Sequence, residues 1–420
     1  MEDFYRNIAK VMGGSFASQL IPLIAYPILS RIYSPSEFGT LATVLILATL
    51  ISIFLSGCYE HAILVTKTKF EEYLLVAYII KRAIILSLLL CIIITLFSTE
   101  LSIIFANPDL ASVGFLIPII ALFNIAYMLL CETMVRRKKF GMLSVTKILQ
   151  SGFVVLNKIG LKIIAHINHG LIIGDLTGKF LLVIIFFVKS LQKNFRRKVF
   201  VFCRGSSKGI KVKFKDFPRL MIPDQLMNNL SGSLHIFIIG PIFGTEQVGY
   251  LALLFSALYL PVTIISTSIK DVFRQKAHEQ YKSNGNCRTL FLSTLIKLCI
   301  ISLPFFLVLF FISPWLFPVI FGAEWSVVGI YAQIMIPMYY ANLISMSFSG
   351  VLIFTRKIKV SLYWQLINLF VSTIALVVGT LIYSDIFICL YLLAAGRALS
   401  YLLYLLIAFH YAKEKERLVI

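Results

Sequence analysis

Runs of apolar residues, each about 20 residues long, recur along the whole chain and set the strongest constraint on its fold. Such a run is long enough to cross the hydrocarbon core of a bilayer as a helix. Inside that core the backbone must satisfy its own hydrogen bonds, so helices are the expected element. The runs are continuous and lack the alternating pattern of barrel strands. The predicted fold class is therefore an all-α integral membrane protein.

Twelve of these runs are predicted to span the membrane as helices. The composition agrees with this prediction, because 59% of the residues are hydrophobic and only 14% are charged. No small-residue cleavage site follows a short apolar core near the N-terminus, so we expect the first span to be retained. The predicted spans are 9–30, 39–57, 83–103, 113–133, 143–164, 170–189, 219–242, 247–268, 290–312, 327–353, 361–383 and 386–409.

Basic residues are concentrated in alternate connections between the predicted spans. The chain has 39 Lys and Arg against 19 Asp and Glu, which gives a formal net charge of +20. The connections after the fourth, sixth, eighth and tenth spans are basic, whereas Arg31 is the one Lys or Arg in the connections after odd-numbered spans. Cytoplasmic loops of membrane proteins collect Lys and Arg, so this pattern predicts that both termini are cytoplasmic. The charge therefore does not indicate a nucleic-acid partner.

Two related halves are predicted on either side of a basic linker. The segment Ile32–Ala42 aligns with Ile242–Ala252 at a constant offset of 210, and each segment joins the first two spans of its half. Six spans is an even number, so the halves share one orientation around a repeat axis along the membrane normal. This arrangement predicts a cavity between the halves. The expected domains are an N-terminal six-helix half at 1–190, a basic cytoplasmic linker at 191–218 and a C-terminal six-helix half at 219–420.

Five segments spread over nearly the whole chain share a familiar order and spacing. They are SRIYSPSEFGTLA (Ser30–Ala42), YEHAIL (Tyr59–Leu64), FGTEQVGYLAL (Phe243–Leu253), VFRQKA (Val272–Ala277) and FGAEWSVVGIYAQIMIP (Phe321–Pro337). In these segments the chain resembles the multidrug/oligosaccharidyl-lipid/polysaccharide exporter superfamily, within it the polysaccharide-export branch that includes O-antigen flippases of the Wzx type. The resemblance implies two six-helix bundles, alternating access and an undecaprenyl-pyrophosphate-linked oligosaccharide repeat unit, of O-antigen or capsule type, as the cargo.

The same resemblance implies a multi-pass flippase of the bacterial cytoplasmic (inner) membrane that acts in lipopolysaccharide or other polysaccharide biosynthesis. The expected partners are the lipid-linked oligosaccharide, membrane lipid, and polysaccharide polymerase and chain-length proteins. No enzymatic activity and no cofactor are expected. The run Gly174–Phe180 resembles a phosphate-binding loop but lacks its spacing and the Ser or Thr after the lysine. The six histidines and the scattered cysteines form no metal-binding pattern.

Two deep basic residues are the first candidates for substrate binding. A charge at mid-bilayer costs about 2.5–3.5 kcal/mol on insertion scales, so buried ionisable residues are functional candidates by default. Arg397 lies about midway along the last span, and Lys179 has a comparable position in the sixth span. If both face the cavity, each half supplies one cation, and such cations suit a pyrophosphate. An internal structural partner is the alternative role for Arg397.

Asp175 and Lys158 are predicted to face each other across the hairpin between the fifth and sixth spans. Folding the hairpin near residue 167 places the two groups at similar depth. They would then form an ion pair that joins two helices, or take part in coupling to protons or sodium. Asp224 is a further candidate for coupling. The sixth span also carries a small-residue stripe that predicts close helix packing, formed by Gly170, Gly174 and Gly178.

Neutral polar residues lie in the first and seventh spans. Gln225, Asn228 and Asn229 follow Asp224 as a polar stripe near the inner end of the seventh span, and Gln19 is a comparable residue in the first. Their amide groups suit hydrogen bonds to sugar hydroxyls. Hydrogen bonding between helices is the alternative role, because it is common in membrane bundles.

Two other functions remain open from the sequence. A cation-coupled multidrug exporter of the same superfamily would be expected to place acidic groups in its cavity, whereas the deepest charges here are basic. A membrane glycosyltransferase or polymerase would be expected to have a large outer loop with catalytic carboxylates, whereas the predicted outer loops are short. The sequence favours a lipid-linked saccharide as cargo and does not identify the sugar.

Overall fold

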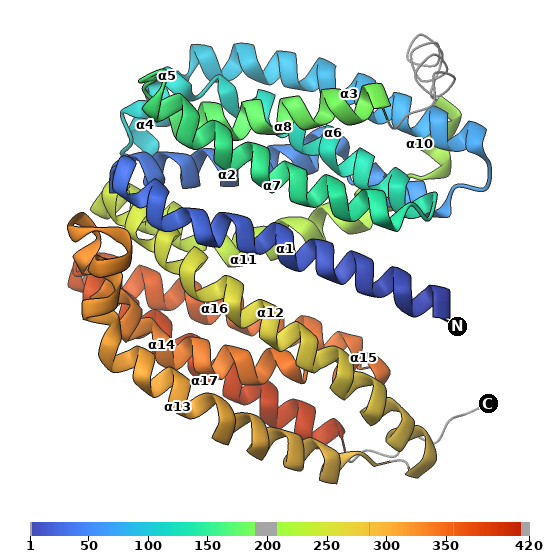
Figure 1. Ribbon diagram of the computed structural model, residues 1–420, viewed down its shortest axis with the longest axis vertical. Helices are drawn as coiled ribbons and strands as arrows, with labels where there is room; N and C mark the ends of the chain where they lie inside the picture. The colour runs from blue at the N-terminus through green and yellow to red at the C-terminus, as the bar shows by residue number, and fades with distance from the viewer. Residues whose placement is uncertain (1, 190–207, 285, 356, 413–420) are drawn as a thin grey trace. The chain divides into compact units, whose positions relative to one another are not determined.

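The computed structural model describes residues 2–189, 208–284, 286–355 and 357–412. Within these ranges every regular element is a helix, as the sequence predicts. The contacts of the chain divide it into two compact units, Met1–Gly249 and Tyr250–Ile420. Each unit is a helical bundle (Figure 1).

The first unit is built from seven long helices and four short ones within the part of the chain that the structure describes. The long helices are α1 (Glu2–Ile32), α2 (Pro35–Ser56), α3 (Lys69–Leu96), α6 (Leu116–Arg136), α7 (Phe140–Ile163), α8 (Gly170–Lys189) and α11 (Asp216–Phe243). The short ones are η1 (Tyr59–Val65), α4 (Ser98–Ile104), α5 (Asp109–Val113) and α10 (Lys208–Lys213).

The second unit contains most of the long helix α12 and the helices that follow it. They are α12 (Thr245–Asn284), α13 (Arg288–Phe321), η2 (Ala323–Trp325), α14 (Ser326–Ser347), α15 (Val351–Phe354), α16 (Ile358–Val378), η3 (Gly379–Tyr383) and α17 (Ile386–Tyr411). Of the linker predicted at 191–218, residues 191–207 lie outside the described residues. Because α11 belongs to the first compact unit, the boundary between the two compact units differs from the predicted boundary between the two six-helix halves. The division into six-helix halves stays a prediction.

The predicted spans agree with the helices in number and, with one exception, in position. Ten helices of the described residues are long and apolar enough to cross a membrane, and the other two predicted spans coincide with α1 and α8. The third span was predicted at 83–103, but α3 occupies Lys69–Leu96. Lys81 and Arg82 therefore lie inside this helix and not before it. In the structure Arg82 donates from Nη2 to the carbonyl oxygen of Phe54 at 3.0 Å, so its charge caps the end of α2.

The connections of the first unit lie at two opposite ends, as expected for antiparallel neighbouring spans. At one end, Arg136 in the last turn of α6 pairs with Glu72 in the first turn of α3, with 2.9 Å between Nε and Oε2. At the other end, Nζ of Lys162 lies 2.9 Å from Oε1 of Glu37, near the connections after α1 and α7. The basic connections therefore share one end of this unit.

Glu72 is the centre of a buried clamp at the basic end. Its carboxylate also pairs with Arg137, at 2.8 Å between Nη2 and Oε1. Arg136 donates further hydrogen bonds from Nη1 to the carbonyl oxygens of Ile63 and Thr66, at 2.8 and 2.7 Å. The clamp joins η1, α3 and α6. The carboxylate of Glu72 offsets part of the charge that the two arginines bring to this end of the bundle.

Gly39 and Gly249 form a reciprocal close contact within the first unit. A Cβ added to Gly39 would overlap the carbonyl oxygen of Thr245, and a Cβ added to Gly249 would overlap that of Pro35. Thr245 corresponds to Pro35, and Gly249 to Gly39, at the offset of 210 found in the sequence. Equivalent residues thus contact each other in both directions, as they do about a twofold axis. The contact supports the predicted internal repeat.

We predict that Gly39→Ala and Gly249→Ala each destabilise the protein by about 1–3 kcal/mol, because the added methyl group overpacks a backbone contact. Thermal unfolding of the purified chain in detergent measures the effect. Gly160→Ala and Gly232→Ala are matched controls, since no heavy atom lies within 4 Å of either added Cβ. Equal unfolding temperatures for the two pairs of variants would contradict the assigned role.

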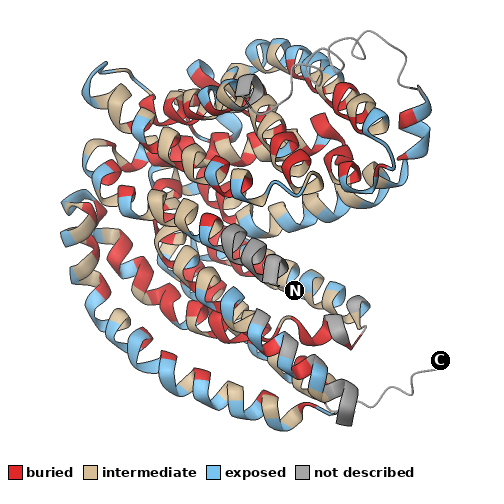
Figure 2. Cartoon of the chain, turned by 45° about the vertical axis from the view of Figure 1, so that its right-hand side comes forward, coloured by how far each residue is buried: buried red, intermediate tan, exposed pale blue. Residues whose placement is uncertain are grey.

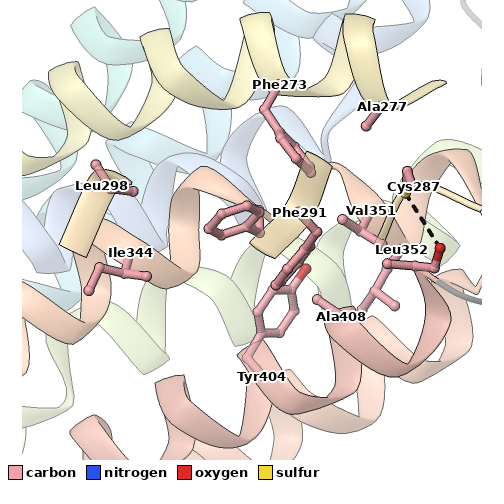
Figure 3. Close-up of a cluster of buried hydrophobic side chains, with 12 residues drawn as sticks. Phe273, Ala277, Cys287, Phe291, Leu298, Ile344, Val351, Leu352, Tyr404 and Ala408 are labelled. Atoms are coloured by element: carbon pink, nitrogen blue, oxygen red, sulfur yellow. Dashed lines mark hydrogen bonds between the residues drawn. The ribbon is translucent and has the colours of Figure 1, made fainter. Parts of the chain in front are cut away.

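Aromatic side chains form the core of the second unit. At the end where α12 meets α13, the ring centroids of Phe273 and Phe291 lie 6.1 Å apart, and both rings are labelled in Figure 3. The ring of Phe348 packs against them, with its centroid 4.8 Å from that of Phe273 and 4.2 Å from that of Phe291. The backbone N–H of Cys287 donates to the carbonyl oxygen of Ala412 at 3.0 Å, which holds the start of α13 against the end of α17. This packing fixes the α12–α13 hairpin.

Buried residues lie on the inner sides of the helices in each unit (Figure 2). Many of the exposed residues are large and apolar. Large exposed apolar surface is unfavourable in water and favourable in lipid. The surface therefore agrees with a multi-pass membrane protein.

Candidate functional site

Asp175 on α8 lies between two lysines inside the first unit. Its Oδ2 is 2.6 Å from Nζ of Lys179, one turn further along the same helix. Its Oδ1 is 3.7 Å from Nζ of Lys158 on α7. All three side chains are largely buried. The contact suggested by the sequence between Lys158 and Asp175 is present, and Lys179 joins it to form a charge triad.

Close packing of α7 against α8 positions the triad. A Cβ added to Gly174 would lie 2.7 Å from Cα of Lys158, and one added to Gly178 would lie 2.6 Å from Cα of Val154. The hydroxyl of Tyr33 donates to the carbonyl oxygen of Lys158 at 2.6 Å and so links the connection after α1 to α7. The glycine stripe therefore packs the two helices closely, as predicted.

The triad carries a net positive charge, since two ammonium groups share one carboxylate. Electrostatic interactions are stronger at low effective dielectric, so the carboxylate stabilises both cations where water is scarce. The sequence offered Lys179 as a cavity cation, but its ammonium group is directed to Asp175 and its side chain is 12% exposed. A role of Lys179 in binding therefore involves the whole triad.

We predict that Asp175→Asn destabilises the first unit by about 3–5 kcal/mol, because it leaves two buried ammonium groups without their shared counter-ion. Thermal unfolding in detergent and the amount of folded protein in membranes measure this effect. The control is Lys162→Gln, which removes a half-exposed ion pair that is expected to contribute at most about 1 kcal/mol. If Asp175→Asn unfolds at the temperature of this control, the triad does not stabilise the bundle.

Lys147 is a partly buried basic residue of α7 that the sequence analysis did not identify. Its Nζ donates to Oγ of Ser15 on α1 at 2.9 Å. Lys147 lies eleven residues before Lys158, which is close to three helical turns, so both lysines lie on one side of α7. That spacing is a signal visible in the sequence. Its position near the basic run Arg136–Lys139 makes Lys147 look like a residue of the membrane boundary.

Arg397 lies on α17 in the second unit, where polar groups from other helices surround it. Its Nε donates to Oγ of Ser372 on α16 at 3.0 Å. It also lies close enough to Tyr259 of α12 and Tyr339 of α14 to interact electrostatically with their hydroxyl groups. Arg397 is partly exposed. The structural partner considered from the sequence is therefore present, and the residue retains some exposed surface.

The polar stripe of the seventh predicted span lies on α11. Asp224 and Asn228 are one turn apart and exposed, whereas Gln225 and Asn229 are partly buried. Nδ2 of Asn229 donates to the carbonyl oxygen of Gln225 at 2.8 Å, so this amide is engaged within its own helix. Gln19 on α1 is partly buried. Asp224 and Asn228 are thus the members of the stripe with the most accessible side chains.

Glu60 is a second buried carboxylate that sequence reasoning missed. It is 4% exposed, and its Oε1 accepts a hydrogen bond from Ser56 Oγ at 3.2 Å. Its Oε2 is buried without a hydrogen-bond partner among the described residues. Burial raises the pKa of Glu60, the nearby Glu132 raises it further, and His61 opposes the shift. In the sequence, Glu60 looks like a solvated loop residue between two spans.

We predict that Glu60→Gln raises thermal stability at about pH 8.5 and has little effect at about pH 5.5. Because the pKa of Glu60 is raised in the folded protein, the protonated carboxyl group favours the folded state. Its contribution to stability is present at low pH and is lost as pH rises through the pKa of the folded state. Glutamine resembles the protonated form and removes the loss. Unfolding temperatures of both proteins across this range test the prediction, and parallel profiles would contradict it.

Comparisons with known proteins identify relatives of this chain. The polysaccharide biosynthesis protein family matches residues 28–329, which is more than half of the sequence. No curated protein gives a significant match. Among solved structures, the lipid II flippase MurJ in an inward closed conformation is similar, with a TM-score of 0.75 and 14% identity over 96% of this chain and 89% of that chain.

Transporters of the MOP superfamily share the fold at lower similarity. An outward-facing multidrug resistance MATE family transporter gives a TM-score of 0.53 and 14% identity over 97% of this chain and 94% of that chain. A MOP superfamily transporter from Pyrococcus furiosus, described as having a binding pocket of reverse polarity, also gives 0.53 and 14%, over 97% of this chain and 96% of that chain. At these identities the similarity establishes the fold.

Proposed function

Because the chain belongs to the polysaccharide biosynthesis protein family and has the fold of MOP superfamily proteins, we propose that it is a flippase for lipid-linked oligosaccharides. The cargo is an undecaprenyl-pyrophosphate-linked repeat unit of O-antigen or capsule type. The protein moves it from the cytoplasmic to the outer leaflet of the bacterial inner membrane. The solved structure with the highest TM-score given above is itself named as a flippase of lipid II.

The net positive charge of the triad is the observation that carries this proposal. In the first unit, Lys158 and Lys179 share the single carboxylate of Asp175. In the second unit, Nε of Arg397 donates to the hydroxyl group of Ser372. The planar guanidinium suits two phosphate oxygens, and a lysine supplies a mobile point charge. Such groups favour an anionic head group over a cationic drug.

The triad also explains how a deep cation is kept available without a large cost to folding. An unpaired ammonium group is expensive inside a membrane protein, and Asp175 offsets this cost for Lys179 in the resting state. An incoming pyrophosphate provides oxygens that replace part of the carboxylate's interaction with Lys179. The second cation, Lys158, stays with Asp175 and keeps that carboxylate compensated.

Transport follows an alternating-access scheme in this proposal. The six-helix halves expected at 1–190 and 219–420, joined by the cytoplasmic linker at 191–218, rock about the site while the polyprenyl tail stays in lipid. The membrane potential assists, since each negative charge moved outward across an inside-negative membrane gains about 2.3 kcal/mol per 100 mV. Asp175 and Asp224 are the candidates for coupling to protons or sodium. Polysaccharide polymerase and chain-length proteins are the proposed partners.

We predict that Arg397→Ala and Lys179→Ala each reduce surface polysaccharide at normal protein abundance. A lost charge-assisted contact of about 1.5–3 kcal/mol corresponds to about a tenfold or larger loss of transport. Surface glycan and the abundance of each variant are measured in the same cells. Lys359→Ala, which removes an exposed lysine of α16, is the control. Full export by the double variant would exclude the proposed cationic site.

A cation-coupled multidrug exporter is the alternative function, because a MATE family transporter shares the fold. Accessible Asp224 on α11 is the residue that favours it, since a carboxylate suits a cationic drug. A deletion strain separates the two functions. Altered drug resistance with intact surface glycan would support the exporter, and lost surface glycan with unchanged resistance would support the flippase.

A further inference from the structure

A groove of about 490 Å³ lies between the last turns of α12 and the first turns of α13 in the second unit. This volume is typical of ligand sites. Lys276 on α12 and Lys297 on α13 both line it, and so do the hydroxyl groups of Ser293 and Thr294 on α13. Among the described residues that line the groove, both charged side chains are lysines. The polar part of the groove therefore suits an anion whose oxygens accept hydrogen bonds.

Apart from Ser268, the rest of the groove is apolar. Val272 and Ile269 of α12 and Leu290 of α13 contribute aliphatic surface. Phe273 forms part of the lining and is 4% exposed, because it also packs in the aromatic core of the hairpin (Figure 3). A ligand that fills this space therefore combines an anionic group with hydrocarbon. A small soluble anion would leave the aliphatic side chains in contact with water.

The side of α13 that faces the groove continues along the helix as an exposed apolar stripe. Ile301, Val308, Phe311 and Trp315 follow Lys297 at intervals of three, four or seven residues, so they lie on the same side of the helix. They are 75%, 56%, 72% and 66% exposed, respectively. Hydrocarbon chains that leave the groove would lie along this stripe.

The length of α13 places the groove at the membrane boundary. The helix rises about 1.5 Å per residue, so the part from Lys297 to Phe321 is about 36 Å long and covers the roughly 30 Å hydrocarbon core. In this placement the membrane-spanning part of α13 is shifted toward Phe321 from the predicted span at 290–312, and Lys297 lies at the level of lipid head groups. The preceding turns, which begin at Arg288, extend beyond the membrane.

We propose that this groove binds an anionic phospholipid, with its phosphodiester between Lys276 and Lys297 and its acyl chains along the exposed stripe of α13. Basic pockets between helices at a membrane boundary bind such head groups. The two lysines supply the charge, Ser293 and Thr294 supply hydrogen bonds, and the apolar wall distinguishes a lipid from a soluble anion. This site is independent of the transported saccharide and of the charge triad.

Native mass spectrometry of the purified full chain, titrated with phosphatidylglycerol or phosphatidylcholine, tests the site. The wild type is expected to retain one phosphatidylglycerol more tightly than phosphatidylcholine. Each of Lys276→Gln and Lys297→Gln is expected to weaken phosphatidylglycerol binding about fivefold, and the double variant about thirtyfold. Ser293→Trp fills the groove while retaining both lysines, and it should also abolish the preference.

A double variant of exposed lysines outside the groove, Lys211→Gln with Lys359→Gln, is the matched control for net charge. It is expected to bind both lipids as the wild type does. Equal binding of the two lipids by the wild type, or wild-type binding by Ser293→Trp, would overturn the proposal. Displacement of phosphatidylglycerol by inorganic pyrophosphate would assign the groove to a soluble anion and would also overturn it. Unfolding temperatures of all variants confirm that they are folded.

Discussion

The shared counter-ion at Asp175 is the interaction on which the account of this protein depends. A single carboxylate keeps two lysines charged inside a helical bundle. The triad is held by close packing of α8 on α7, where Gly174 and Gly178 meet the backbone of α7. Removing any one member changes the balance of the other two. The same physical demand, that a buried charge must have a partner, explains why Arg397 is bonded to Ser372 and why Glu72 is clamped by two arginines.

Charge placement also relates the proposed transport site to the proposed lipid site. Deep cations whose charge is partly offset by a carboxylate suit an anionic group that passes through the membrane, because they bind this group weakly enough to release it. Exposed lysines at the membrane boundary, such as Lys276 and Lys297, suit a lipid that stays in place. The two sites therefore use the same residue types at different depths, and depth determines which role each lysine can have.

The sequence predicted those features that follow from hydrophobic length and from repetition. The spans, their alternating direction and the repeat at offset 210 appear in the helices, in the connections gathered at each end and in the reciprocal contact of Gly39 with Thr245. The sequence predicted less well which side chains contact each other, because such contacts depend on the direction of each side chain. The spacing of Asp175 and Lys179 placed them on one side of α8, but their ion pair was visible only in the structure. Glu60 illustrates the same limit, since burial of a residue between two spans depends on tertiary packing.

Lipid-linked repeat units in a strain that lacks this protein provide the most direct test of the central claim. Their sidedness can be measured by labelling the saccharide in intact cells and in inside-out membrane vesicles. We predict that the repeat units accumulate on the cytoplasmic side in the deletion strain and that the wild-type chain restores them to the outer side. Repeat units that reach the outer leaflet at the normal rate without this protein would contradict its assignment as their flippase.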